Sequence, residues 1–151
     1  YKITKKFRKL LSKDRYHFFI INFANPDMVA HSGNMQATIK AVEHVDKAVS
    51  ELVDAVLSKD GTVIITADHG NAEDLLTFPS TSYFITSSEG QINTEHSNNP
   101  VPVIVIDRKF QGNPMKLPKG TLAVLAPTIL TLMGVPVPKE MTGKTLIEKE
   151  V

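Results

Sequence analysis

The 151-residue chain has 42% hydrophobic and 22% charged residues, proportions typical of a soluble globular protein with one core. Its 17 basic and 16 acidic residues leave a net charge of +1, without the basic density that binding a nucleic-acid backbone requires. The longest apolar runs are too short, or too interrupted by proline, to span a membrane, and the absence of cysteine excludes disulfides and thiolate metal sites.

The first half of the chain predicts a strand, a helix and a second strand. Residues 5–9 are basic around one Phe and indicate the solvated face of a helix, whereas the apolar residues 18–23 predict a buried strand. Residues 34–58 repeat apolar side chains at steps of three and four, which predicts an amphipathic helix that ends at Asp60-Gly61. Residues 62–67 predict the second strand, and such a βαβ unit is expected to have parallel strands.

Residues 69–100 form a polar segment in which only residues 83–85 predict a short strand. A loop of this length in a compact domain is typical of a functional segment. Residues 101–106 then predict a third strand with a proline near its start.

The end of the chain predicts one more helix, over residues 122–133. Pro127 has to lie in its first turn or kink it, and Gly134 occupies the position of a C-terminal cap. We expect the polar tail, residues 139–151, to pack loosely.

Polar clusters at residues 25–31, 67–71 and 94–100 follow two of the predicted strands or lie in the long loop. Ligands collect at the carboxyl ends of strands in open parallel sheets, so we expect these clusters to meet at one edge. Together they provide five potential metal ligands: Asp27, His31, Asp68, His69 and His96. Carboxylate and imidazole are the ligand set of Mn²⁺, Zn²⁺ or Fe²⁺, whereas Mg²⁺ and Ca²⁺ prefer oxygen.

The spacing of these five residues in the sequence indicates how they could be divided between metal ions. Asp27 and His31 are four residues apart, so one helical turn places them on the same side. Asp68 and His69 are neighbours and can serve one ion only if the chain bends, for which Gly70 offers freedom. Five ligands are too many for one ion with an open position, and two ions sharing a phosphate is the simpler interpretation.

Structural roles are the alternative for each residue taken singly. Asp68 could cap the turn after its strand, and Asp107 is better explained as a loop carboxylate than as support for a ligand. His44 lies among charged residues of the long helix and His17 precedes the first strand, so both are expected at the surface.

Several segments resemble cofactor-independent phosphoglycerate mutases of the bacterial and plant type. Residues 25–34 (Asn-Pro-Asp-Met-Val-Ala-His-Ser-Gly-Asn) resemble that family's N-P-D-M-V-G-H-T-G-N segment. Further matches, in chain order, are residues 66–73 to T-A-D-H-G-N-A, 96–102 to H-S-T-N-P-V-P, 122–134 to L-A-D-I-A-P-T with a following helix, and 141–147 to M-T-G-K-S-L-I.

The resemblance implies an α/β fold of the alkaline-phosphatase-like type: three layers, a mostly parallel sheet and flanking helices, present here as an incomplete C-terminal portion. It implies that Asp27, His31 and His96 bind one metal ion, and that Asp68 and His69 contribute to a second. The expected ions are two Mn²⁺, with Zn²⁺, Co²⁺ or Mg²⁺ as alternatives, and 2,3-bisphosphoglycerate is not needed. The implied reaction is the interconversion of 3- and 2-phosphoglycerate through a phosphoserine.

In the family, the nucleophilic Ser and a further Asp ligand come from an N-terminal segment, and the inserted domain grips the substrate. Neither matches residues 1–151, and the start at Tyr1 without an initiator Met indicates a piece of a longer chain. We therefore expect this chain alone to be inactive. The longer enzyme is expected to be a cytoplasmic, glycolytic isomerase that is monomeric and binds neither nucleic acid nor membrane. The alternatives are another phosphotransferase or phosphohydrolase of the superfamily, or a non-catalytic fragment.

Overall fold

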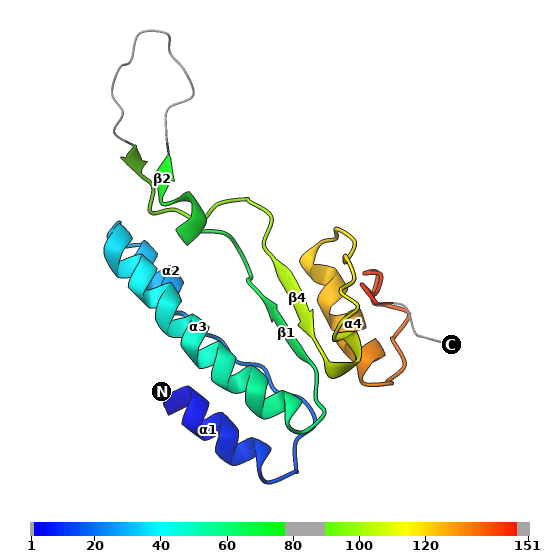
Figure 1. Ribbon diagram of the computed structural model, residues 1–151. Coiled ribbons are helices and arrows are strands. Elements are labelled where there is room, and N and C mark those ends of the chain that lie inside the picture. Colours follow the sequence, from blue (N-terminus) through cyan, green and yellow to red (C-terminus); the bar gives the residue numbers. More distant parts are fainter. Residues whose placement is uncertain (1, 78–89, 148–151) are drawn as a thin grey trace. The chain divides into compact units, whose positions relative to one another are not determined.

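The computed structural model describes residues 2–77 and 90–147 and divides into two compact units, Tyr1–Val105 and Ile106–Val151. The predicted strand at residues 83–85 lies outside the described residues. The elements of the first unit are α1 (Lys2–Leu11), α2 (Asn25–Ala30), α3 (Met35–Leu57), β1 (Val63–Thr66), η1 (Ala72–Asp74), β2 (Leu76–Thr77) and β3 (Gln91–Ile92) (Figure 1). β4 (Val103–Ile106) reaches the boundary, and η2 (Arg108–Phe110), η3 (Leu122–Val124) and α4 (Leu125–Leu132) follow it.

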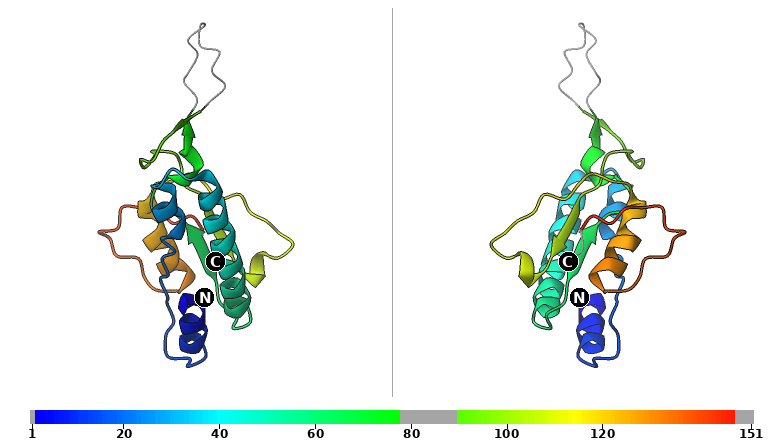
Figure 2. Two further views of the ribbon diagram at one scale, coloured as in Figure 1. Left: turned by 90° about the vertical axis from the view of Figure 1, so that its left-hand side faces the viewer. Right: turned by 90° about the vertical axis from the view of Figure 1, so that its right-hand side faces the viewer.

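Helix α1 packs against α3 through one narrow face, and Figure 2 shows it beside the C-terminal half of α3. Thr4 and Phe7, three residues apart, are its buried side chains, and the Phe7 ring meets the edge of Phe19 at a centroid distance of 4.9 Å. The lysines and arginine of residues 5–9 are exposed, as predicted. Helix α1 therefore buries one side of its surface and leaves its basic residues exposed to solvent.

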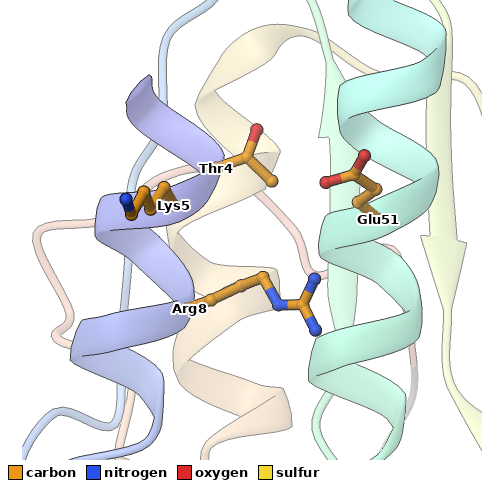
Figure 3. Close-up of a pocket in the computed structure, with 4 residues that line it drawn as sticks. All are labelled: Thr4, Lys5, Arg8 and Glu51. Atoms are coloured by element: carbon orange, nitrogen blue, oxygen red, sulfur yellow. The ribbon is translucent and has the colours of Figure 1, made fainter. Parts of the chain in front are cut away.

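A cleft of about 400 Å³ lies between α1 and α3, lined by Thr4, Lys5, Arg8 and Glu51 (Figure 3). The Arg8 side chain extends toward α3, whereas Lys5 points away from it. Charged side chains therefore line part of the boundary between these two helices.

Helix α3 confirms the predicted amphipathic helix to within one residue at each end. Asn34 caps its start, because the Asn34 side chain accepts a hydrogen bond from the backbone N–H of Ala37 at 3.0 Å. The helix packs against α2, where Ala30 is fully buried and permits close approach. Ile39 and Val42, which the pattern placed on the apolar face, are 44% and 47% exposed.

The predicted strand at residues 18–23 is wrong, because these residues form no ladder in the structure. A strand needs a partner for its backbone hydrogen bonds, and β1 pairs with β4 instead. β1 and β4 confirm the other two predicted strands and form a two-stranded sheet in which, as Figure 1 shows, they run in opposite directions. The predicted parallel βαβ unit is therefore wrong, because its first strand does not form and β1 has an antiparallel partner.

A second two-stranded sheet, which the sequence did not predict, pairs β2 with β3 in the antiparallel direction. Leu76 lies opposite Ile92, and Thr77 lies opposite Gln91. Leu75, just before this sheet, is only 1% exposed and belongs to the core of the first unit. The ladder therefore joins the two ends of the long polar segment close to where the predicted ligands lie.

In the second unit, α4 has Pro127 in its first turn, and Gly134 ends it with φ of +69°, as predicted. Gly134 N–H bonds to Thr131 O at 3.1 Å and Val135 N–H to Leu130 O at 2.9 Å, which is a Schellman cap. Asp107 caps η2 by accepting from the Lys109 N–H at 3.0 Å.

The expectation of a loosely packed tail is wrong for Leu146 and Ile147, each only 8% exposed. The buried hydroxyl of Thr128 accepts the Leu146 N–H at 2.9 Å, so the tail is fixed by both packing and a hydrogen bond. None of the helices within residues 2–77 and 90–147 combines the length and apolar character that a membrane crossing requires.

Candidate metal centre

Helix α2 places Asp27 and His31 on one side, as their spacing predicted. The His31 N–H donates to the backbone oxygen of Asp27 at 3.1 Å, which closes one helical turn. His31 Nε2 then lies 3.3 Å from Asp27 Oδ1. Gly33, with φ of +70°, reverses the chain directly after this turn.

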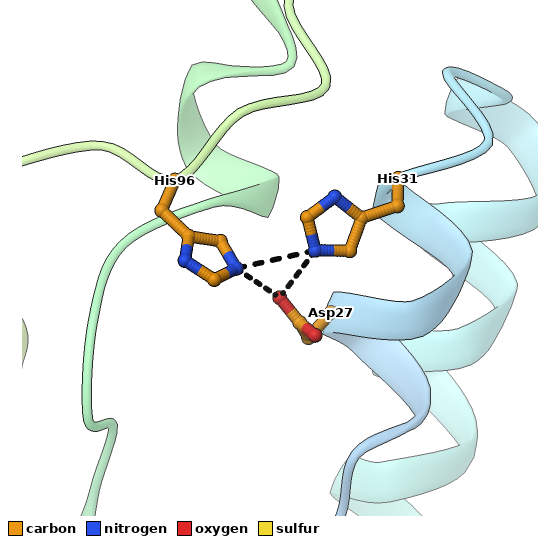
Figure 4. A group of neighbouring side chains, drawn as sticks. All are labelled: Asp27, His31 and His96. Atoms are coloured by element: carbon orange, nitrogen blue, oxygen red, sulfur yellow. Dashed lines mark hydrogen bonds and ion pairs between the residues drawn. The ribbon is translucent and has the colours of Figure 1, made fainter.

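His96 reaches the same point from the far end of the long polar segment. Ser97 forms an antiparallel bridge with Gly70, and the Ser97 N–H donates to Gly70 O at 2.9 Å. This bridge holds His96 so that its Nε2 lies 3.2 Å from Asp27 Oδ1 and 3.2 Å from His31 Nε2 (Figure 4). His96 therefore meets His31 and Asp27, which precede it in the sequence by 65 and 69 positions.

These atoms form a nearly equilateral triangle that suits a first-row metal ion. Ligand distances of about 2.1 Å place neighbouring ligand atoms roughly 3.0 to 3.4 Å apart in octahedral or tetrahedral geometry. The observed edges are 3.3, 3.2 and 3.2 Å. The side chains of Asp27, His31 and His96 are 34%, 41% and 48% exposed, so a further ligand can approach from solvent.

The second ring nitrogen of His31 has a backbone partner. His31 Nδ1 lies 2.7 Å from the carbonyl oxygen of Thr94. A carbonyl oxygen only accepts, so Nδ1 carries the proton and Nε2 presents its lone pair to the triangle. Outer hydrogen bonds of this kind fix the orientation of metal-binding histidines.

Asn71 is a member of the site that the sequence reasoning missed. Its Nδ2 donates to Asp27 Oδ1 at 3.1 Å and lies 3.5 Å from His31 Nε2. The residue is only 5% exposed, and its Oδ1 is buried without a hydrogen-bond partner among the described residues. The only signal in the sequence was its place directly after Asp68-His69-Gly70.

Asp68 and His69 lie in a bend after β1, outside the triangle. His69 Nε2 is 3.6 Å from Asp68 Oδ2, so the bend turns both side chains to one side. The His69 ring stacks on His96 at a centroid distance of 3.7 Å, while the Asp68 side chain is 84% exposed. The pair therefore lies next to the triangle, and the Asp68 carboxylate is accessible from solvent.

Gly70 is needed for a reason other than the expected one. Its φ lies outside the left-handed range, but a Cβ there would lie 2.1 Å from Ser97 Oγ and 2.3 Å from Glu73 Oε1. A larger residue at position 70 would therefore displace the Ser97 and Glu73 side chains.

The remaining histidines lie away from these residues. His44 and His17 are exposed, as predicted, and His44 Nδ1 lies 2.7 Å from the backbone oxygen of Lys40 in its own helix. His44 is therefore a natural control for the metal site.

Comparison with known protein families shows which family the chain belongs to. The model of the Metalloenzyme superfamily matches residues 1–137. The chain belongs to the Metalloenzyme superfamily. This membership, and a group of three side chains that could hold an ion, agree with the expectation of metal chemistry.

Curated relatives of the chain have a more specific name, 2,3-bisphosphoglycerate-independent phosphoglycerate mutase. The chain is 44% identical over 149 residues to that of Clostridium perfringens strain SM101 and 44% to that of Clostridioides difficile strain 630. It is 45% identical over 148 residues to that of Clostridium acetobutylicum. Each comparison covers 98–99% of this chain but only 27% of the relative, so the chain spans about a quarter of their length.

A solved structure of phosphoglycerate mutase from Leishmania mexicana, obtained at low cobalt concentration, superimposes with a TM-score of 0.82 and 34% identity. It covers 97% of this chain and 28% of that enzyme's chain. The expected fold, an incomplete portion of an alkaline-phosphatase-like α/β fold, is thereby confirmed, as is the resemblance to this mutase family.

Proposed function

We propose that the chain is the C-terminal part of the metal-binding domain of a phosphoglycerate mutase that uses two ions. Asp27, His31 and His96 bind the first ion, and Asp68 and His69 contribute to the second. The single observation that supports this most strongly is the triangle of ligand atoms with edges of 3.2 to 3.3 Å. The named activity of the relatives supports the choice of reaction.

Bound ions would neutralise negative charge on the oxygens of a phosphate during its transfer. The protein's part is to hold the ligands: Asn71 orients the Asp27 carboxylate, and the Thr94 carbonyl fixes His31. Mixed carboxylate and imidazole ligands favour Mn²⁺, with Zn²⁺, Co²⁺ or Mg²⁺ as alternatives. The substrate we infer is phosphoglycerate, without any need for 2,3-bisphosphoglycerate.

The chain alone is proposed to be inactive, because the serines beside the ligands are already engaged. Ser32 Oγ donates to the backbone oxygen of Val29 at 2.6 Å, and Ser97 Oγ donates to Glu73. The nucleophile and the remaining ligand of the second ion would come from segments outside residues 1–151, as would the substrate domain. The longer enzyme is proposed to be a monomeric, cytoplasmic enzyme of glycolysis.

Metal titration of the purified chain tests this proposal. Calorimetry with Mn²⁺ should show one strong site in the wild type, at least about 100-fold weaker binding in His96→Ala, and unchanged binding in His44→Ala. Phosphorus NMR with 3-phosphoglycerate and Mn²⁺ should show no 2-phosphoglycerate. Absence of binding, or equal binding by His96→Ala, contradicts the metal site, and appreciable turnover contradicts the assignment as an inactive part.

A further inference from the structure

Glu73, in η1, accepts hydrogen bonds from two segments of the chain, one next to it in sequence and one more than 20 residues further on. Its Oε2 accepts the backbone N–H of Asn71 at 2.7 Å. Its Oε1 accepts from the hydroxyl of Ser97 and, at 3.1 Å, from Nδ2 of Asn99. One carboxylate therefore joins the segment after β1 to the segment that carries His96.

The same contacts lead to the ligand triangle. Ser97 follows His96 directly, so a bond to its side chain limits where the His96 ring can lie. Asn71, held by its backbone at Glu73, donates from its side chain to Asp27. Through these bonds Glu73 connects the three parts of the chain that supply Asp27, His96 and the Asp68–His69 pair.

The packing around Glu73 leaves little freedom. A Cβ added at Gly70 would overlap Glu73 Oε1 and Ser97 Oγ, so a larger residue there would displace these two side chains. The short Gly70–Ser97 bridge runs beside the carboxylate and keeps both segments in register.

An ionised carboxylate suits these donors better than an amide. Each of the three donors is an N–H or O–H group, and the carboxylate offers acceptors on both oxygens. A glutamine would place an NH₂ group against one of the donors. Burial acts to raise the pKa of Glu73, but hydrogen bonds from Ser97, Asn71 and Asn99 outweigh it and lower the pKa, which agrees with a charged side chain.

We propose that Glu73 is a positioning residue of the metal site: it holds the His96 segment and Asn71 in place and does not itself coordinate an ion. This inference rests on the proposed function, because it assumes that the triangle binds metal. Both Glu73 oxygens accept hydrogen bonds from the protein, which leaves them poorly placed to serve as ligands.

Four variants of the full 151-residue chain test the inference: Glu73→Ala, Glu73→Gln, Ser97→Ala and, as a control on the exposed surface of α3, Glu43→Gln. Calorimetry gives Mn²⁺ affinity, and the visible spectrum of bound Co²⁺ at saturation reports the ligand geometry. We expect roughly 10- to 100-fold weaker Mn²⁺ binding and a changed Co²⁺ spectrum in Glu73→Ala, a smaller effect in Glu73→Gln, and none in Glu43→Gln.

Ser97→Ala removes one bond and keeps Glu73, so it tests the same link if Glu73→Ala fails to fold. The double variant Glu73→Ala, Ser97→Ala should bind about as weakly as Glu73→Ala alone, because both act through one contact. If the wild type binds Mn²⁺ and the variants bind it equally well, with an unchanged Co²⁺ spectrum, the role of Glu73 is overturned but the metal site is not. A wild type that binds no Mn²⁺ overturns the proposed function and this role with it.

Discussion

The Nδ1 atom of His31 lies 2.7 Å from the carbonyl oxygen of Thr94, which is 63 positions away in the chain. The carbonyl can only accept, so neutral His31 should carry its proton on Nδ1. This is the less common tautomer of free histidine, and nitrogen chemical shifts from long-range proton–nitrogen NMR can identify it. We expect the Nδ1–H form for His31 before metal is added, and a shift confined to Nε2 on titration with Zn²⁺.

His44 is a suitable internal reference, because its ring lies on the exposed surface of α3. Zn²⁺ should leave the nitrogen shifts of His44 unchanged. Observation of the Nε2–H form for His31, or of equal Zn²⁺ effects on the two rings, would contradict the arrangement described.

The amide of Asn71 makes a second prediction. Asn71→Asp places a negative charge beside Oδ1 of Asp27, where Nδ2 now donates at 3.1 Å, and Asn71 is only 5% exposed. Loss of this donor and repulsion between the carboxylates should lower the free energy of unfolding of the metal-free chain by about 2 to 3 kcal/mol. Urea unfolding measures this, and Asn98→Asp, at an exposed position next to the same segment, should change it by less than about 0.5 kcal/mol. Equal effects of the two substitutions would refute a role for Asn71 at Asp27.

The sequence predicted the elements that depend on local chemistry. Helix α3 has an apolar pattern and an Asn34 cap, and α4 has Pro127 and Gly134 at the positions that suit a helix start and end. The predicted strand at residues 18–23 failed because strand formation needs a neighbour, which an apolar pattern does not supply. The β2–β3 ladder was missed because two-residue strands leave no period to detect.

The meeting of Asp27, His31 and His96 could be predicted because Asp and His side chains are few and their spacing is informative. Asp27 and His31 are one turn apart, and His96 belongs to a compact polar motif. Asn71 and Glu73 were missed because their roles depend on contacts across the fold, and an amide or a carboxylate in a polar segment looks like ordinary surface. The close approach of the Ser97 and Glu73 side chains to Gly70 could not be predicted for the same reason.

Gly33 provides a third prediction. Its φ is +70°, and an added Cβ would lie 2.8 Å from Cγ2 of Ile92, two residues before Thr94. Gly33→Ala should therefore cost about 2 to 4 kcal/mol of stability, from backbone strain and steric overlap together, and should weaken Mn²⁺ binding by displacing the segment that holds His31.

Gly112 is the matched control for Gly33. Its φ is +82°, but an added Cβ there would meet nothing within 4 Å. Gly112→Ala should cost only the backbone term, about 1 to 2 kcal/mol, and leave Mn²⁺ affinity unchanged. Urea unfolding and calorimetry on both variants separate the two terms. Equal losses of stability and unchanged metal affinity in Gly33→Ala would contradict the steric account.

Thr128 makes a prediction for the second unit. Its buried hydroxyl donates to the backbone oxygen of Val124 at 2.6 Å and accepts the Leu146 N–H at 2.9 Å. Thr128→Val keeps the shape but leaves the Leu146 N–H without its partner, which should cost about 1 to 3 kcal/mol. Hydrogen exchange of the Leu146 amide should become faster in Thr128→Val, whereas Thr128→Ser should retain most of the protection. Unchanged exchange in Thr128→Val would show that packing alone holds the tail.

The hydrogen bonds to Glu73 also predict how stability depends on pH. Although burial acts to raise the pKa of Glu73, hydrogen bonds from Ser97, Asn71 and Asn99 bring it below the ordinary value of 4.5. A carboxyl with a lowered pKa in the folded state stabilises the fold fully above its unfolded pKa, and this contribution is lost as pH falls through the folded pKa. The difference in urea midpoint between wild type and Glu73→Gln should therefore be constant from pH 7 to about pH 5.5 and should shrink below about pH 4.5. Subtracting the variant removes the titration of other carboxyls, and Glu43→Gln should show no such pH-dependent difference. A difference that persists undiminished to pH 3 would mean that the charge of Glu73 is not what joins the two segments.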